Sequence, residues 1–107
     1  MDTELAQFAT YLKFEKTVSD HTHRNYMSDL KQFQRYLMEK KKAMQWQDVT
    51  NITIRNYLGN LYNHHSRATI ARKLSAIRHF LHYLVREKVV ATDASELIST
   101  TKQEQKL

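Results

Sequence analysis

The apolar residues recur every three or four positions in four separate stretches of the chain, which is the spacing of helices with one buried side. The clearest stretch is 66–88, where isoleucine and leucine dominate one side and small or basic residues the other. Ser66 stands where an N-cap would accept a hydrogen bond from the first turn. The predicted buried stripe of this helix is Ile70, Leu74, Ile77, Leu81 and Leu84, widened by Phe80 and Val85.

Three more helices are predicted from the same pattern, each with a serine, threonine or aspartate near its start as a cap. They cover 3–15 with Asp2 or Thr3 as the cap, Ser19 to about Lys41, and about 51–63 after Thr50. Their buried stripes are Leu5, Phe8, Ala9 and Leu12, then Tyr26, Leu30, Phe33 and Leu37, then Ile54, Leu58 and Leu61.

The segments outside these helices contain residues that we expect to cover the core. Trp46 is the one aromatic residue between the second and third helices, so we expect it to plug the core rather than stack on a ligand. Val89 and Val90 are expected to cover another part of the core. The remaining predictions are a short fifth turn with Leu97 and Ile98, capped by Asp93 or Thr92, and a polar tail at 99–107.

The composition favours a helical fold. The 107 residues suffice for one domain with one core, and they include no proline and only one glycine. β-Hairpins and irregular loops usually need more of both residues. We therefore predict an all-α fold, a compact four- to five-helix bundle. The absence of cysteine excludes a disulfide framework and fits a cytoplasmic protein, and no secretory or membrane-spanning segment is expected.

The net charge of +6 is concentrated in two of the predicted helices. Segment 21–42 has six Lys or Arg residues against two acids, a net charge of +4, and 66–88 has six against one, a net charge of +5. Two cationic helices in an otherwise balanced chain indicate a polyanionic partner, which in the cytosol is usually nucleic acid. Two alternatives stay open: a solvated basic surface without a ligand, and a helical protein-interaction module whose basic face binds an acidic partner.

Helical projection gives the side chains expected on the outer face of each cationic helix. On the second helix, with the acid Asp29 off to the side, they are Arg24, Ser28, Lys31 and Arg35, near His21 and Asn25. On the fourth helix they are Arg72, Ser75, Ala76 and His79, flanked by Arg67, Thr69 and Lys73. Such faces suit DNA, because a major groove admits one helix while flanking cations meet phosphates. The three lysines at 40–42 either interact with the negative end of the helix dipole or bind a phosphate.

No catalytic or metal-binding constellation is predicted. His79 and His82 lie one turn apart and follow His64 and His65, but no carboxylate stands beside them at ligand spacing. The six tyrosines fall mostly on or beside the apolar stripes, where they would belong to the core. The chain also lacks a glycine-rich phosphate loop and an isolated pair of acids on a common face. We therefore expect binding, without a metal or cofactor, rather than catalysis by these residues.

Two motifs give the chain a resemblance to a known family. The first is FATYLKFE at 8–15, followed by Ser19-x-x-Thr22-x-x-x-Tyr26-x-x-Asp29-Leu30-x-x-Phe33, and the second is ARKLSAIRHFLHYLVRE at 71–87. They resemble the N-terminal core-binding (SAM-like) domain of tyrosine recombinases, the phage-integrase superfamily, and most closely its Xer-type members. The resemblance covers nearly the whole chain. Lys88 stands where that family usually has glycine, and Asp93-Ala94 where it often has Asn-Pro, which leaves the turn geometry there open.

The resemblance implies a half-clamp that grips one face of double-stranded DNA at a recombination site, with the second and fourth helices crossing the major groove. It also implies contacts with other recombinase protomers on DNA and a separate C-terminal catalytic domain that is absent here. On this basis we expect a core-binding domain at 1–98, the start of an interdomain linker at 99–107, and a monomer when the domain is isolated.

The predicted DNA-binding residues combine the resemblance with the helical projection. The resemblance assigns Thr22 and Arg24 on the second helix, and Thr69, Arg72, Lys73, Ser75 and Arg78 on the fourth. The projection places Arg78 nearer the buried edge of its helix. The full predicted set is Thr22, Arg24, Ser28, Lys31, Arg35, Arg67, Thr69, Arg72, Lys73, Ser75, Arg78 and His79.

Overall fold

Each of the four predicted stretches is a helix in the computed structural model, which describes residues 1–98. The helices are α1 (Asp2–Phe14), α2 (Asp20–Glu39), α3 (Asn51–Leu61) and α4 (Arg67–Arg86), with a short 3-10 turn, η1 (Trp46–Asp48), before α3. No strand occurs within residues 1–98. The prediction of an all-α bundle is therefore confirmed. The expected tail and linker at 99–107 lie outside the described residues.

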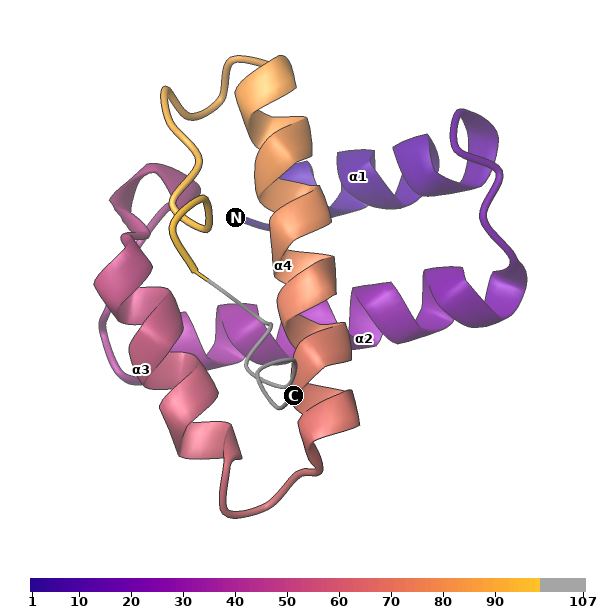
Figure 1. Cartoon of the computed structure of the whole chain (residues 1–107). Coiled ribbons are helices and arrows are strands. Elements are labelled where there is room, and N and C mark those ends of the chain that lie inside the picture. The colour runs from indigo at the N-terminus through magenta and orange to yellow at the C-terminus, as the bar shows by residue number, and fades with distance from the viewer. Residues whose placement is uncertain (99–107) are drawn as a thin grey trace.

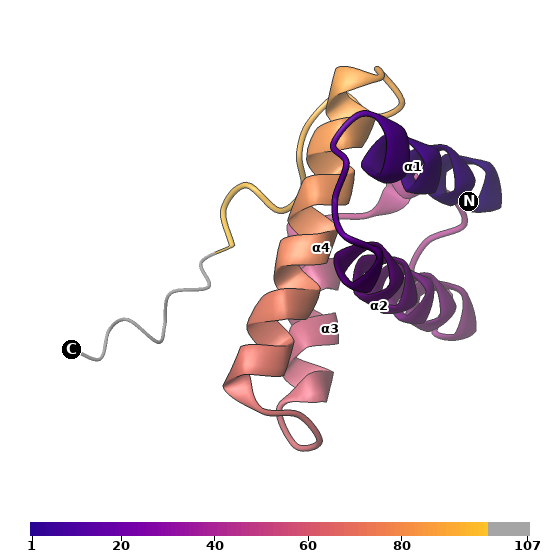
Figure 2. The same ribbon diagram turned by 90° about the vertical axis from the view of Figure 1, so that its right-hand side faces the viewer.

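α4 crosses α1 and α2 and joins them to α3. α1 and α2 run side by side, and α4 lies across both, as the two views show (Figure 1, Figure 2). α3 packs beside the first half of α4. The core comprises Leu5, Phe8 and Leu12 of α1, Leu30, Phe33 and Leu37 of α2, Ile54 and Tyr57 of α3, and Leu74, Ile77, Phe80, Leu81 and Leu84 of α4. In the described part of the chain, no helix is both long and apolar enough to cross a membrane.

The predicted N-caps of α2, α3 and α4 are confirmed. In each helix a backbone N–H donates at 3.1 to 3.2 Å to the cap hydroxyl, which belongs to Ser19, Thr50 or Ser66. The expected cap of α1 at Asp2 or Thr3 is wrong, because the helix already begins at Asp2, after Met1. The Asp2 carboxylate instead accepts a hydrogen bond from the Gln34 amide of α2 at 2.7 Å. This contact ties the start of α1 to α2.

α2 and α4 end earlier than predicted, because the residue after each C-cap adopts a left-handed conformation. Lys41 has φ 54° and Lys88 has φ 63°. The N–H groups of Lys88 and Val89 then bond to the carbonyls of Val85 and Leu84 at 3.0 and 2.9 Å, which closes a Schellman motif. Lys88 thus takes the conformation for which glycine is usual, and the turn forms without a glycine.

Two of the segments outside the helices cover the core as predicted. Trp46 is 1% exposed, and its indole N–H donates to the carbonyl oxygen of Met1 at 3.1 Å. Its ring packs edge-on against Phe80, with the ring centroids 4.7 Å apart. Val89 and Val90 are half-buried against the same core.

The segment after α4 is fixed by Asp93. One of its carboxylate oxygens accepts hydrogen bonds from the N–H and the hydroxyl of Ser95, at 2.8 and 2.6 Å. The other oxygen pairs with His82 of α4 at 2.7 Å. The expected fifth turn is therefore confirmed, with Asp93 and not Thr92 as its cap, and it does not extend into a fifth helix. Ile98 is buried, whereas Leu97 is exposed.

Candidate nucleic-acid interface

The crossing of α2 and α4 is organised by the carboxylate of Asp29. Arg72 donates from Nε and Nη2 to its two oxygens, at 3.0 and 2.8 Å, and the ammonium of Lys73 donates to Oδ1 at 3.0 Å. Asp29 is only 2% exposed. Asp29 therefore lies off the outer face, as expected, but the two cations of α4 enclose it, which the helical projection did not predict.

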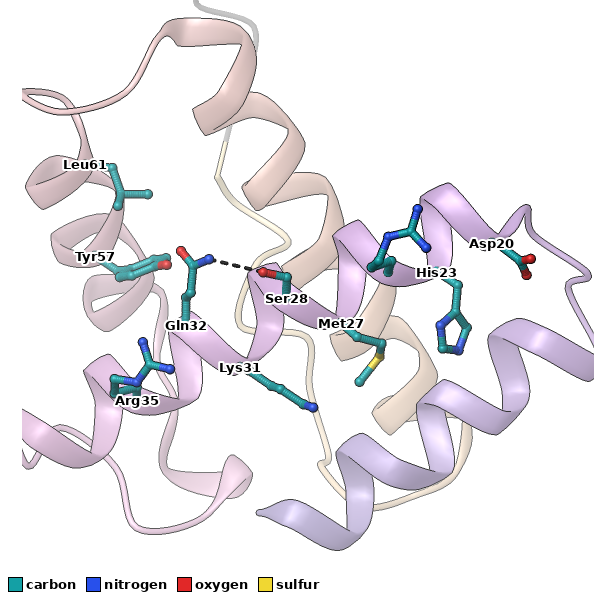
Figure 3. A pocket seen from close by; sticks show the side chains of 10 residues that line it. Asp20, His23, Met27, Ser28, Lys31, Gln32, Arg35, Tyr57 and Leu61 are labelled. Carbon is teal, nitrogen blue, oxygen red and sulfur yellow. Dashed lines mark hydrogen bonds between the residues drawn. The ribbon is translucent and has the colours of Figure 1, made fainter.

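Lys73 lies inside the crossing and connects it to the surface of α2. The residue is 3% exposed, and its ammonium also donates to Oε1 of Gln32 at 2.9 Å. The Gln32 amide in turn donates to the hydroxyl of Ser28 at 3.3 Å (Figure 3). The projection had placed Lys73 beside the outer face. The structure places it in the interior, because Asp29 and Gln32 supply acceptors for its charge.

Arg72 remains at the surface while it is bound to Asp29. Its side chain is 43% exposed, and its third nitrogen, Nη1, forms no hydrogen bond with residues 1–98. The hydrogen bond to Asp29 raises the pKa of Arg72, so the guanidinium stays charged. A bidentate pair of this kind fixes the orientation of the guanidinium plane. Arg72 can therefore present Nη1 to a ligand without giving up its partner.

A second contact joins the two helices through Tyr26. Its hydroxyl lies 3.2 Å from the hydroxyl of Ser75, and its ring lies against that of His79, with centroids 5.4 Å apart. Partial burial lowers the pKa of His79, and the nearby charges of His82 and Lys16 lower it further. At neutral pH the imidazole of His79 is therefore uncharged and offers one donor and one acceptor.

Four of the five predicted residues of α2 line a groove of about 860 Å³ that runs along that helix and reaches Tyr57 and Leu61 of α3. Figure 3 shows Ser28 and Gln32 on one side of α2 and Lys31 on the other. Burial, together with the charge of Asp29, raises the pKa of Tyr57 to about 12, so its hydroxyl stays protonated. The predicted DNA-binding residues in this groove are Arg24, Ser28, Lys31 and Arg35.

The other predicted residues differ in their exposure. Arg67 and His79 are exposed, and Thr22, Thr69, Ser75 and Arg78 are half-buried. The half-buried position of Arg78 agrees with the helical projection, and Arg78 forms no ion pair within residues 1–98. The outward placement of Ala76 is wrong, because this residue is 0% exposed. α1 and α2 both pack against α4, so the buried sector of α4 is wider than its apolar stripe.

Sequence reasoning did not assign a binding or positioning role to Asp29 or Gln32. The one signal in the sequence was that Asp29 is the only acid between Asp20 and Glu39, a stretch that also holds three cations. A lone carboxylate in such surroundings is a candidate ion-pair partner, but the sequence does not say with which cation. No three His, Cys, Asp or Glu side chains within residues 1–98 are grouped so that they could hold a metal ion.

Comparison with known proteins identifies the fold family. Residues 5–88 match the family described as phage integrase, N-terminal SAM-like domain. The chain belongs to this family. The resemblance seen in the two sequence motifs is therefore confirmed. No solved structure gives a significant match to this SAM-like domain.

Similar curated proteins include Xer recombinases, as the motifs indicated. The SAM-like domain is 40% identical over 108 residues to tyrosine recombinase XerC of Natranaerobius thermophilus and 41% identical over 98 residues to XerC of Myxococcus xanthus. It is 37% identical over 108 residues to tyrosine recombinase XerD of Staphylococcus haemolyticus. These matches cover 100%, 92% and 100% of this chain, but only 36%, 32% and 36% of the relatives. The chain thus spans about a third of their length.

The two family motifs meet at the α2–α4 crossing of the SAM-like domain. Asp29 belongs to the first motif, and Arg72, Lys73 and Ser75 belong to the second. The residues that form the Asp29 contacts are 43 and 44 positions apart in sequence. The structure therefore gives the two motifs one shared physical role, which is to hold α2 against α4 around a buried charge.

Proposed function

We propose that this SAM-like domain binds double-stranded DNA as the N-terminal half-clamp of a tyrosine site-specific recombinase, and so serves DNA integration and recombination. The observation that carries the proposal is the crossing of α2 and α4, where Asp29 of α2 keeps Arg72 of α4 at the surface. α4 has five Lys or Arg residues and no acid, and segment 21–42, which includes most of α2 and the lysines after it, has a net charge of +4. Membership of the phage-integrase family and similarity to Xer recombinases support it.

In this proposal each helix supplies a different kind of contact. Arg72 donates from Nη1 to a base edge or phosphate while its other donors stay on Asp29. Arg24, Ser28 and Arg35, along the groove of α2, contact the phosphate backbone. Lys73 does not touch DNA, because it is buried, and instead keeps the net charge of the crossing positive.

The proposal assigns the chain a binding role without a cofactor. The strand-exchange chemistry of the recombinase is assigned to a separate catalytic domain. On DNA, this domain would lie beside other recombinase protomers, whereas alone it would be a monomer. A chromosomal or mobile-element DNA target would place the protein in the cytoplasm, with the nucleoid.

Titration of a labelled duplex with the chain at several salt concentrations tests the proposal. We expect affinity to fall steeply with salt, because each neutralised phosphate releases a counterion. Arg72→Ala should weaken binding by about 1–3 kcal/mol, or about 5- to 150-fold. Arg86→Ala is the matched control, because Arg86 is an exposed arginine at the far end of the same helix. The affinity of the Arg86→Ala variant for the duplex should stay within about twofold of that of the unaltered chain.

An NMR titration identifies the surface that binds. Duplex DNA should shift amide resonances in 21–35 and 67–79 and leave α1 largely unchanged. A folded Arg72→Ala variant with an unaltered titration curve would contradict the assigned interface. Shifts with an acidic peptide but not with a duplex, at moderate salt, would support the protein-interaction module instead.

A further inference from the structure

Besides the groove along α2, a second concave surface lined by basic residues lies at the C-terminal end of α2, beside α3. We call it the α2–α3 hollow; its volume is about 440 Å³. It is lined by Tyr36, Lys40 and Lys42 from α2 and the residues after it, and by Arg55, Asn56, Gly59 and Asn60 of α3. None of these residues is acidic, and none belongs to the DNA-binding set predicted from the sequence. The hollow is therefore a separate concentration of positive charge.

The end of α2 brings two of the lysines together. Lys41 is left-handed, and its N–H bonds to the carbonyl of Met38 at 3.2 Å. The N–H of Lys42 returns to the carbonyl of Leu37 at 2.8 Å, so the chain doubles back at the helix end. As a result, Lys40, the C-cap of α2, and Lys42, two residues further on, both line the hollow.

The three cations of the hollow are not neutralised within residues 1–98. Lys40, Lys42 and Arg55 form no ion pair there, whereas the ion pairs of this part of the chain use Arg72, Lys73, His82, Arg86 and the N-terminus. Uncompensated charges around a concave surface focus the potential and attract an anionic ligand. The amide groups of Asn56 and Asn60 add hydrogen-bond donors to the same surface.

The residues that line the hollow favour a polyanion over a protein segment. Protein partners usually bind through an aromatic or aliphatic anchor seated in a pocket. The one aromatic residue of the hollow, Tyr36, packs against Tyr57 with ring centroids 5.0 Å apart. Gly59 leaves the wall open, since a Cβ placed there would meet nothing within 4 Å. The hollow thus offers charges and amides but no apolar pocket.

The α2–α3 hollow and the groove along α2 are neighbours, because Tyr36 lines the hollow and Tyr57, whose ring packs against that of Tyr36, lines the groove. From Arg24 to its C-cap Lys40, α2 extends about 24 Å at about 1.5 Å per residue. One strand of B-DNA places about seven phosphates along that length, at about 3.4 Å each. We propose that the α2–α3 hollow binds the phosphodiester backbone of duplex DNA beyond the segment gripped at the α2–α4 crossing. This inference rests on the proposed function.

A charge placed on the wall of the hollow gives the sharpest test. Gly59→Glu adds a carboxylate and Gly59→Gln adds a neutral side chain of nearly the same shape, and both residues favour helix more than glycine does. With a duplex of about three helical turns and no chosen sequence, Gly59→Glu should bind about 5-fold or more weakly than Gly59→Gln. Equal affinities of the two folded variants would overturn the inference.

The salt dependence of binding gives the number of phosphates that the hollow neutralises. The triple variant Lys40→Gln, Lys42→Gln, Arg55→Gln should reduce the slope of log K against log salt by up to about 2.7, or about 0.9 for each phosphate that is no longer neutralised. A control triple variant removes the same charge at the far ends of α1 and α4, at Lys13, Arg86 and Lys88. A slope change in the first variant no larger than in the control would overturn the inference.

The outcomes separate this inference from the proposed function. If Arg72→Ala weakens binding and the hollow variants do not, the proposed function stands and the hollow plays no part. If the unaltered chain does not bind a duplex at all, both are overturned. If polyglutamate binds the chain and Gly59→Glu abolishes that binding while duplex binding is unchanged, the hollow is a site for an acidic protein and the assignment to DNA is wrong.

Discussion

Removing the Asp29 carboxylate should be among the most destabilising single changes in the domain. Asp29→Ala leaves the ammonium of Lys73, 3% exposed, without the anion that faces it at 3.0 Å. Breaking a buried ion pair on one side usually costs about 3–5 kcal/mol. Deprotonating an ordinary lysine ammonium at neutral pH costs about 4.6 kcal/mol, which sets a ceiling on the penalty. We therefore expect a loss of about 3–4 kcal/mol.

Such a loss is large for a chain of this size. A domain of about 100 residues is stable by roughly 5–15 kcal/mol, and each 1 kcal/mol shifts Tm by about 4–8 °C. Urea unfolding of Asp29→Ala, followed by the fluorescence of the buried Trp46 and by circular dichroism, measures the loss. The expected fall in Tm is about 12–30 °C.

Two companion variants test the cause. Lys73→Met keeps the Asp29–Arg72 pair and replaces the buried ammonium with an apolar group, so it should cost much less than Asp29→Ala. The double variant should regain part of the stability lost in Asp29→Ala, because no charge is then left buried without a partner. A loss below about 1 kcal/mol in Asp29→Ala, or a double variant no more stable than Asp29→Ala, would refute the reasoning.

Three further predictions concern other parts of the bundle. Lys88→Gly should raise the free energy of unfolding in urea by about 0.5–1 kcal/mol, because glycine adopts φ 63° at little cost. Trp46→Ala should lower it by about 3–5 kcal/mol, since it empties a fully buried site. In an NMR titration His79 should have a pKa below 6.5. Just below pH 6.5 the unfolded chain then binds more protons at His79 than the folded chain, so acidification should destabilise the unaltered chain more than His79→Gln.

Each of these predictions has a control or an outcome that would contradict it. Gln7→Gly, at an exposed position inside α1, should lose about 1 kcal/mol, and a similar loss in Lys88→Gly would contradict the benefit assigned to the left-handed turn. A loss of less than about 1 kcal/mol in the free energy of unfolding of Trp46→Ala would contradict this prediction, because it would mean that neighbouring side chains fill the cavity. His82→Gln should raise the pKa of His79, since it removes one of the causes of the lowering, and an unchanged midpoint would contradict that cause.

The helices were predictable because their signals are local. Ser19, Thr50 and Ser66 each bond to a backbone N–H three residues away, so a sequence pattern contains both partners of the cap. The early ends of α2 and α4 were not predictable in the same way. A left-handed residue is usually glycine, and at Lys41 and Lys88 a lysine takes this conformation because the bonds of the turn hold it there.

The candidate site was predictable only in part, because its decisive contacts join residues far apart in sequence. A helical projection gives the direction of a side chain but not what lies opposite it. It therefore placed Arg72 correctly at the surface but also put Ala76 outside, where α1 and α2 in fact cover α4. The partner of Lys73 is 44 positions away, and no local pattern pairs it with Asp29.

The contacts of Asp93 have a mechanical consequence. This residue holds Ser95 on one side and His82 of α4 on the other, and the buried Ile98, three residues after Ser95, anchors the same segment. A force or torque applied to the backbone at Ile98 is therefore transmitted to the second half of α4, because the segment between them is held by these contacts. A change in the orientation of α4 and a twist of the backbone at Ile98 are thus coupled through the side chains of Asp93 and Ile98.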